Sequence, residues 1–264
     1  MLKLGFLFLL GVFFLTGCQP TLTVPAPDTF SPQPACNVPG TVQCLSLSPT
    51  SRGYAYEYQI YLPPCYETRA DQHYPVLYLV PGRGSGPGTW FAAGLAGIVD
   101  EMILENEIPA LIIVTTQNTD GDMHAEAIQN DLIPYIESAY RIRPEREYHA
   151  VAGGSLGGIA AYRIGLSNPA HFSSIALFGS GLVSGEESQF EKWLDSIPAE
   201  QGLRFFMACG TGDPLMLERS RVLAAMLDKK SIPYVFHSGD GEHTYSYWLS
   251  NFPQYLRWLA KDWP

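Results

Sequence analysis

The segment Val151-Ala152-Gly153-Gly154-Ser155-Leu156-Gly157-Gly158 is an apolar run that ends in glycines placed around a single serine. Gly153, Ser155 and Gly157 match the pattern Gly-X-Ser-X-Gly, in which the serine occupies a tight turn between a strand and a helix. A serine held at positive φ, with its hydroxyl raised above the backbone, leaves no room for side chains two residues to either side. Glycine-rich turns after strands also bind phosphate, so the surrounding sequence has to distinguish a nucleophile from an anion site.

Strand and helix patterns alternate along the chain on both sides of this segment. Strand patterns cover residues 54–62, 74–80, 110–116, 148–153, 174–178, 203–209 and 234–237, and helix patterns cover 92–105, 123–140, 155–167, 187–197, 215–230 and 245–261. Such alternation predicts an α/β fold, with a mostly parallel central sheet and helices on both faces. In that fold the active site lies at the carboxyl ends of the strands, where the loops after residues 80, 153 and 209 would meet.

The N-terminus has the features of an export signal. Lys3 precedes an apolar run, residues 4–15, that is too short to span a bilayer comfortably and is typical of a signal-peptide core. The run ends in Leu15-Thr16-Gly17-Cys18, which resembles the lipobox of bacterial lipoproteins, where cleavage leaves the cysteine as the lipid-bearing N-terminus. We therefore expect a signal peptide over residues 1–17, a lipid on Cys18, and an extracytoplasmic protein anchored to the bacterial cell membrane or outer membrane.

Composition divides the remainder into a linker and one domain. Residues 18–35 carry five prolines among threonines and small residues, which predicts an extended spacer after the lipidated cysteine. Residues 36–264 are long enough for a single α/β-hydrolase domain. The formal net charge of −10 gives no electrostatic reason to bind nucleic acid, so membrane attachment is expected to come from the lipid. The sequence does not indicate an oligomeric state.

Four cysteines besides Cys18 fall within the predicted domain: Cys36, Cys44, Cys65 and Cys209. An exported setting permits disulfides, but four thiols allow three complete pairings and the sequence does not choose among them. We prefer a bridge between Cys36 and Cys65, because it would pin the N-terminal segment to the corner at residues 62–65. Cys209 lies in an apolar strand and is expected to be a buried free thiol.

A serine hydroxyl needs a general base, and His243 is the preferred candidate among six histidines, the others being His73, His124, His149, His171 and His237. His243 follows the last strand in a glycine-flanked loop, at the end of the sheet where the serine should lie. His237 stands at the tip of that strand and is the main rival. His149 lies inside the strand that leads to Ser155 and cannot fold back onto it.

Asp213 is the preferred partner for the histidine, because it leaves the preceding strand through the loop Cys209-Gly210-Thr211-Gly212-Asp213. It completes the order Ser, Asp, His of the α/β-hydrolases, at intervals of 58 and 30 residues. Asp240 is an alternative, although a carboxylate three residues before His243 is better placed to shape the loop. Asp213 could also simply cap the helix that follows it.

An acyl-transfer site also needs two preorganised donors for the oxyanion. One should be the N–H of Leu156, directly after the nucleophile. The other should come from the loop after Val80, with the N–H of Arg83 as first choice and that of Gly82 as second. A phosphate cradle is the alternative for this loop, but it lacks a Gly-Lys-Ser/Thr ending.

Several motifs in order resemble the esterase D, or putative esterase, family of α/β-hydrolases over roughly residues 54–260. They are Tyr61-Leu62-Pro63-Pro64, Val80-Pro81-Gly82 with Trp90, Asp131-Leu132-Ile133-Pro134-Tyr135-Ile136-Glu137, Gly153 to Gly158, Cys209 to Asp213 and Gly241-Glu242-His243. The family includes feruloyl, acetyl-xylan and siderophore esterases, S-formylglutathione hydrolases and mycolyltransferases. The resemblance implies Ser155 as nucleophile, Asp213 as acid and His243 as base. Pro81 departs from the His-Gly common in the family, and its ring removes a backbone donor.

The function expected from these residues is that of a serine esterase, which hydrolyses a small-molecule or glycan-linked ester through an acyl-enzyme. Gly82, Trp90 and Trp248 are candidate substrate contacts, although the aromatic residues Trp90, Phe91 and Trp248, together with Met123, suit a core equally well. Transfer of the acyl group to a cell-envelope acceptor is one alternative. A non-catalytic binding lipoprotein on a hydrolase scaffold is the other.

No cofactor or metal is expected for this chemistry. The cluster Asp120-Gly121-Asp122-Met123-His124 lacks the ligand spacing of a calcium loop or a zinc site. A loop that caps the following helix is the simpler interpretation.

Overall fold

The central sheet of the computed structural model runs through the described part of the chain, residues 36–48, 53, 55–118, 122–198 and 201–263. The predicted signal peptide, Cys18, the linker, Asp120 and Gly121 lie outside these residues. Contacts within the chain group residues 36–264 into one compact unit.

Eight strands of the described chain form one sheet: β1 (Thr41–Leu47), β2 (Tyr56–Leu62), β3 (Val76–Val80), β4 (Ile112–Thr116), β5 (His149–Gly154), β6 (Ser174–Phe178), β7 (Arg204–Gly210) and β8 (Tyr234–Gly239). Their spatial order is β1-β2-β4-β3-β5-β6-β7-β8. β1 with β2 and β2 with β4 pair antiparallel, and every other neighbouring pair is parallel. The predicted mostly parallel sheet is therefore confirmed.

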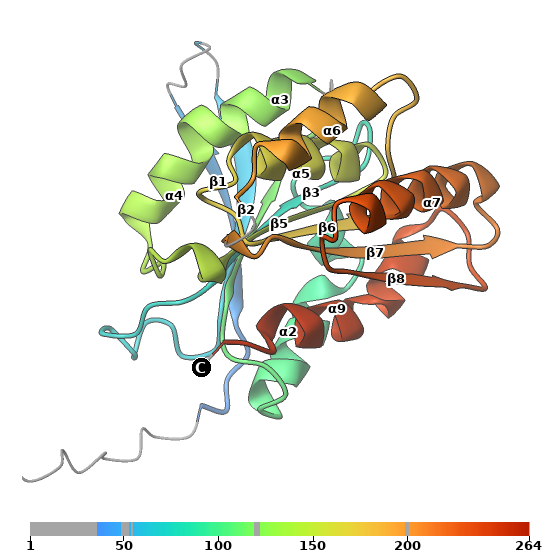
Figure 1. Ribbon diagram of the computed structural model, residues 1–264. Coiled ribbons are helices and arrows are strands. Elements are labelled where there is room, and N and C mark those ends of the chain that lie inside the picture. The colour runs from blue at the N-terminus through green and yellow to red at the C-terminus, as the bar shows by residue number, and fades with distance from the viewer. Residues whose placement is uncertain (1–35, 49–52, 54, 119–121, 199–200, 264) are drawn as a thin grey trace, which may run out of the picture. The chain divides into compact units, whose positions relative to one another are not determined.

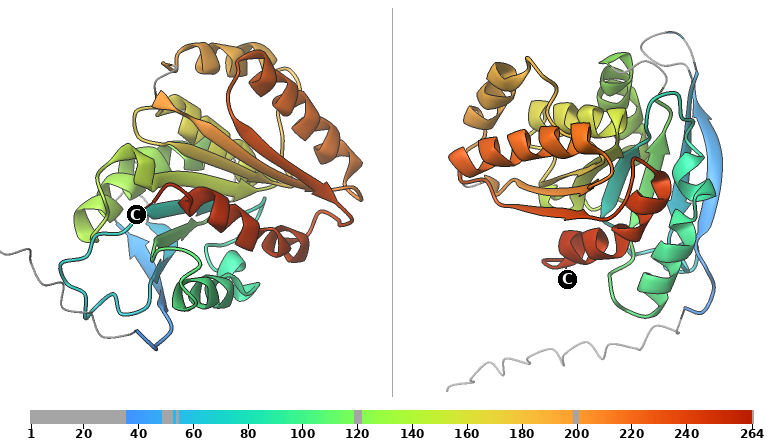
Figure 2. Two further views of the ribbon diagram at one scale, coloured as in Figure 1. Left: turned by 60° about the horizontal axis from the view of Figure 1, so that its bottom comes forward. Right: turned by 90° about the vertical axis from the view of Figure 1, so that its right-hand side faces the viewer.

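Helices cover both faces of this sheet (Figure 1 and Figure 2). One face carries α3 (Asp122–Ala127), a π-helical turn (Ile128–Leu132), α4 (Ile133–Ala139), α5 (Leu156–Ser167), α6 (Glu187–Asp195) and α7 (Pro214–Lys229). The other carries α1 (Thr89–Ala92), α2 (Leu95–Leu104), α8 (Tyr245–Ser250) and α9 (Phe252–Ala260). A short 3-10 helix, Arg146–Tyr148, leads into β5. None of the helices in the described residues is both long and apolar enough to cross a bilayer.

β3 shows why its sequence is continuously apolar. Val76, Tyr78 and Val80 face the core under α3 to α7, whereas Leu77 and Leu79 face the core under α1, α2, α8 and α9. All five side chains are fully buried. A strand covered by helices on both sides needs apolar residues at every position, and alternation would have left one face polar.

Some predicted boundaries were wrong, for reasons visible in the backbone. The helix expected over residues 92–105 is broken at Gly94, which has a φ of +112°. Glycine adopts this backbone conformation readily, whereas other residues would be strained in it. The helix expected over 123–140 passes through the π-helical turn before Pro134, and a wider turn relieves the clash that a proline ring makes with the preceding carbonyl. The interruption that Pro253 predicts in the C-terminal helix is confirmed, since the helix divides at Asn251 and Pro253 lies in the first turn of α9.

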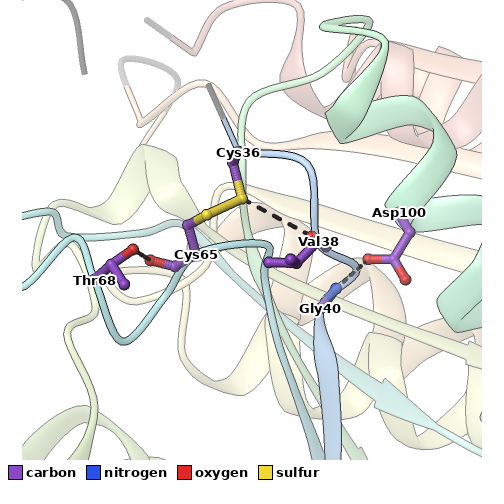
Figure 3. The surroundings of a disulfide bond; sticks show 6 residues. All are labelled: Cys36, Val38, Gly40, Cys65, Thr68 and Asp100. Atoms are coloured by element: carbon purple, nitrogen blue, oxygen red, sulfur yellow. Dashed lines mark hydrogen bonds between the residues drawn. A yellow bond between two sulfur atoms is a disulfide. The ribbon is translucent and has the colours of Figure 1, made fainter. Parts of the chain in front are cut away.

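Cys36 and Cys65 form a disulfide, so the preferred pairing is confirmed (Figure 3). The bridge ties the start of the described chain to the corner after β2. Beside it, the carboxylate of Asp100 accepts the N–H of Gly40 and the hydroxyl of Tyr61, each at 2.7 Å from the same oxygen. Together these bonds hold the segment that leads into β1.

The two remaining described cysteines differ in exposure, since Cys44 is exposed on β1 and Cys209 is buried in β7. Burial raises the pKa of the Cys209 thiol from 9.0 to about 12. At a pH between 9.0 and about 12 the thiol is ionised in the unfolded chain but still protonated in the folded chain. The contribution of this thiol to stability is therefore complete below pH 9 and falls as the pH rises through this range.

We predict that iodoacetamide at pH 8 alkylates Cys209 at least ~100-fold more slowly than Cys44 in the folded protein, because the thiolate is the reacting form and Cys209 is shielded. Peptide mass mapping measures both rates. Unfolding in urea should make them equal. Rapid alkylation of Cys209 before unfolding would contradict the buried placement.

Candidate active site

Ser155 occupies a turn between β5 and α5, and its backbone has φ 52° and ψ −123°. Its N–H donates to the carbonyl of Phe178 at 2.8 Å. A non-glycine residue with this backbone costs about 1–3 kcal/mol and persists only where the surrounding structure holds it. The serine hydroxyl therefore stands at the carboxyl end of the sheet, directly before the first N–H groups of a helix.

The neighbouring glycines pack backbone against backbone. A Cβ added to Gly153 would lie 2.1 Å from the carbonyl oxygen of Gly157, and one added to Gly157 would lie 2.2 Å from the carbonyl oxygen of Val80. The start of α5 thus presses directly on the ends of β5 and β3. The motif glycines are explained by close approach, not by positive φ.

We predict that Gly157→Ala lowers the free energy of unfolding by about 3 kcal/mol or more, since overpacking against a backbone that cannot move aside is costly. Gly97→Ala is the matched control, because a Cβ at Gly97 in α2 meets nothing within 4 Å. That control should be neutral or stabilising by up to about 1 kcal/mol. Urea unfolding of both variants gives the comparison, and equal stabilities would refute the packing argument.

Three loops bring Ser155, His243 and Asp213 together. His243 Nε2 lies 2.8 Å from Ser155 Oγ, and His243 Nδ1 lies 2.5 Å from Asp213 Oδ2. The carboxylate fixes Nδ1 as the protonated nitrogen, which leaves the Nε2 lone pair directed at the serine hydroxyl. This arrangement can draw a proton from the hydroxyl as it attacks an electrophile.

Close contact between two loops aligns the acid with the histidine. Gly212 donates its N–H to the carbonyl of Gly241 at 2.8 Å. A Cβ on Gly210 would lie 2.1 Å from the same carbonyl oxygen. The glycines of these loops therefore let the β7 and β8 ends approach closely.

Asp213 combines the two roles that the sequence left as alternatives. Its Oδ1 accepts the N–H of Met216 at 3.3 Å and caps α7, while Oδ2 contacts the histidine. The carboxylate is mostly buried, with 12% of its side chain exposed against 39% for His243. One side chain can both begin the helix and orient the imidazole.

The rival residues make other contacts. The hydroxyl of Thr211 donates to Asp240 at 3.5 Å. The ring of His237 packs against Phe206 at a centroid distance of 5.4 Å, and its Nε2 has no hydrogen-bond partner in the described structure. His149 begins β5 and so lies at the opposite end of the strand from Ser155.

The loop after β3 lies beside the turn at Ser155, since Val80 pairs with Gly153. The N–H of Gly82 donates to the Tyr245 hydroxyl at 2.9 Å, and this hydroxyl donates to Ser85 Oγ at 3.3 Å. Within the described residues, the backbone N–H groups of Arg83 and Leu156 have no hydrogen-bond partner. Gly82 is therefore engaged, which favours Arg83 over Gly82 as the second oxyanion donor.

Sequence reasoning missed two residues that hold this loop, Tyr245 and Asn118. Asn118 is fully buried, its side-chain amide donates to the carbonyl of Pro81 at 2.8 Å, and its backbone carbonyl accepts the N–H of Gly84 at 2.9 Å. No local motif signals these contacts, because each joins segments far apart in the chain.

Trp90 and Trp248 lie in the core beneath the turn, with 0% and 2% of their surfaces exposed. A Cβ on Gly154 would meet the Trp248 ring at 2.6 Å and the Trp90 ring at 3.1 Å. The Trp248 and His243 rings are also nearly perpendicular, with their centroids 5.1 Å apart. This burial favours support of the turn and the histidine over the direct substrate contact expected from sequence.

Residues 50–259 match the model of the protein family described as Esterase, putative esterase. The chain belongs to this family. An endo-1,4-beta-xylanase/feruloyl esterase of Xylanibacter ruminicola is 27% identical over 187 residues, which make up 65% of this chain and 25% of that protein. An acetyl esterase of Caldicellulosiruptor saccharolyticus is 22% identical over 169 residues, or 52% of this chain and 63% of that protein.

The chain also resembles a solved structure. The feruloyl esterase module of Clostridium thermocellum, complexed with sinapinate, has a TM-score of 0.70 and 20% identity, covering 89% of this chain and 92% of that one. This likeness confirms the α/β-hydrolase fold. The chain spans between 25% and 63% of the length of the two curated relatives named above.

Proposed function

We propose that this esterase-family protein hydrolyses carboxylic esters through an acyl-enzyme on Ser155. The observation that carries the proposal is the continuous hydrogen-bonded chain from Ser155 Oγ through His243 to Asp213, with distances of 2.8 and 2.5 Å. Neighbouring loops supply all three side chains in the order of an α/β-hydrolase.

In the first half-reaction Ser155 Oγ attacks the ester carbonyl while His243 Nε2 takes the hydroxyl proton. Asp213 holds the imidazole in the required tautomer and stabilises the imidazolium that forms. His243 then returns the proton to the departing alcohol, leaving an acyl-serine. In the second half-reaction His243 activates a water, which releases the acid and restores the serine.

The tetrahedral intermediates carry negative charge on the former carbonyl oxygen. The N–H groups of Leu156 and Arg83 are the proposed donors, supported by their lack of other partners in the described structure. Leu156 also begins α5, and the positive end of the helix dipole favours an anion there.

The relatives suggest which acyl groups to test first, since they include feruloyl and acetyl esterases. A panel of nitrophenyl, feruloyl, acetyl-sugar and thioester substrates measures kcat/KM for each, with Ser155→Ala as the control. Turnover that requires Ser155 supports the proposal. Tight ligand binding without turnover of any ester would contradict it, and product analysis with added alcohol acceptors separates hydrolysis from transfer.

We further propose that the enzyme works outside the cytoplasm, attached to the bacterial cell membrane or outer membrane by a lipid on Cys18. Support comes from the sequence Leu15-Thr16-Gly17-Cys18 after a short apolar run. Mass spectrometry of the N-terminal peptide tests this directly. A mature chain that begins upstream of Cys18, or a cysteine without lipid, would refute it.

A further inference from the structure

Glu137, His149 and His171 form a cluster at the opposite end of β5 from Ser155. Glu137 lies in α4, His149 is the first residue of β5, and His171 lies between α5 and β6. His171 Nε2 lies 2.8 Å from Glu137 Oε1 and 3.0 Å from His149 Nδ1. His149 Nδ1 and Glu137 Oε1 are 3.6 Å apart, so three potential ligand atoms face one another.

Hydrogen bonding fixes the protonation of His149. Its Nε2 lies 2.6 Å from the carbonyl oxygen of Arg143, which can only accept, so the proton is on Nε2. In the neutral ring Nδ1 is then a bare lone pair that points into the cluster.

The cluster has more acceptors than protons to share. His149 Nδ1 and the Glu137 carboxylate both accept, and His171 Nε2 touches both with at most one N–H. One N–H cannot point well at two acceptors. A single cation at the centre would satisfy all three lone pairs at once.

The separations suit a metal ion. A circle through the three atoms, with sides of 2.8, 3.0 and 3.6 Å, has a radius of about 1.9 Å, so an ion about 2.0–2.1 Å from each ligand fits slightly off their plane. These are the usual distances from zinc to imidazole nitrogen and carboxylate oxygen. The short nitrogen-to-nitrogen contact is then explained by shared coordination.

We propose that Glu137 Oε1, His149 Nδ1 and His171 Nε2 bind one divalent transition-metal ion of the zinc type. Two imidazoles and one carboxylate form a borderline donor set, and such a set binds zinc in preference to magnesium or calcium. The Arg143 carbonyl orients His149, and the Tyr78 hydroxyl donates to Glu137 Oε1 at 3.4 Å. Outer contacts of this kind commonly fix the ligands of protein zinc sites.

The partial solvent exposure of the cluster allows an ion to enter it from solution. The side chain of His149 is only 3% exposed, whereas those of His171 and Glu137 are 30% and 29% exposed. Solvent can therefore reach one side and supply a further ligand. Ser155 lies six residues along the chain from His149, about 20 Å at 3.3 Å per residue, so the site stabilises three elements and takes no part in ester hydrolysis.

Metal titration of the full chain tests the proposal. Zinc at about 100 times its dissociation constant should raise the melting temperature by ~5–10 °C, and equilibrium dialysis should give one bound zinc at the cluster. Cobalt, used alone as a spectroscopic probe, should give the visible absorption of a low-symmetry site on the unaltered protein. The absence of both the melting shift and the cobalt spectrum would overturn the proposal and leave a hydrogen-bonded cluster.

Variants separate this cluster from other histidines. His171→Gln and Glu137→Gln should each lose the zinc-dependent melting shift and the cobalt spectrum. His73→Gln, which replaces an exposed histidine outside the cluster, should keep both. His171→Gln should also hydrolyse esters at the rate of the unaltered protein. The melting and cobalt measurements do not depend on whether Ser155 proves to be the nucleophile. A zinc shift unchanged in both cluster variants would place the metal elsewhere and overturn the proposal.

Discussion

Replacing Ser155 with alanine is expected to lower kcat for ester hydrolysis by about 10⁵-fold or more, because no nucleophile remains to form the acyl-enzyme. Ser155 Oγ bonds to His243 Nε2, and the turn itself is held by backbone contacts that the variant keeps. The melting temperature should therefore stay the same or rise, since function and stability often oppose each other at such sites. Initial rates on the best substrate of the panel give the measurement.

Ser246→Ala is the matched control for this variant. Ser246 is exposed and lies three residues after His243, so its loss tests whether any serine near the site matters. Its rate should remain within about twofold of the unaltered enzyme. Residual hydrolysis by Ser155→Ala at a comparable rate would mean that another group is the nucleophile.

The second large effect is expected from Asp213→Asn, which should lower kcat by about 10³–10⁴-fold. An amide donor facing His243 Nδ1 favours the tautomer with its proton on Nε2, which cannot accept the serine proton. Asparagine is also a good N-cap, so α7 should keep its start and the stability should change little. Steady-state kinetics and thermal unfolding separate the two roles of this carboxylate.

Asp213→Ala and Asp240→Asn complete this comparison. Alanine removes the cap as well, and should add a loss of about 1 kcal/mol in stability to the loss of rate. Asp240→Asn alters the acid three residues before His243 and should leave the rate nearly unchanged. If Asp240→Asn had a lower kcat than Asp213→Asn, Asp240 and not Asp213 would be the acid that orients His243.

Ser155, Asp213 and His243 could be predicted to lie together because parallel topology sends the carboxyl ends of neighbouring strands to one edge. Each follows a strand whose apolar pattern was clear in the sequence. The exact donors of the loop after β3 were harder to foresee, because the bond from Gly82 to Tyr245 joins residues 163 positions apart. Sequence patterns describe local periods and carry no information on such pairs.

β1 escaped prediction for a different reason. Most of its residues are exposed, so they lack the alternation of buried and exposed positions that marks a half-buried strand. The strand exists because its backbone pairs with β2 over seven positions. Edge strands of this kind depend on their neighbour and not on their own side chains.

The Glu137, His149 and His171 cluster was also invisible to motif reasoning. Its three members come from a helix, a strand and the turn between α5 and β6, with no fixed spacing of the kind that marks zinc fingers or calcium loops. His149 is excluded as a catalytic base because it lies in the strand that leads to Ser155 and cannot fold back onto the serine. That same position is what brings it to the far end of the sheet, beside Glu137 and His171.

A fluorophosphonate probe, followed by mass mapping of the labelled peptide, tests directly whether Ser155 is an activated nucleophile. We expect stoichiometric labelling of Ser155 in the folded protein, with labelling lost in Ser155→Ala and at least ~100-fold slower in His243→Ala. Folded protein that takes up no label, or takes it up on a different serine, would show that Ser155 is not the activated nucleophile.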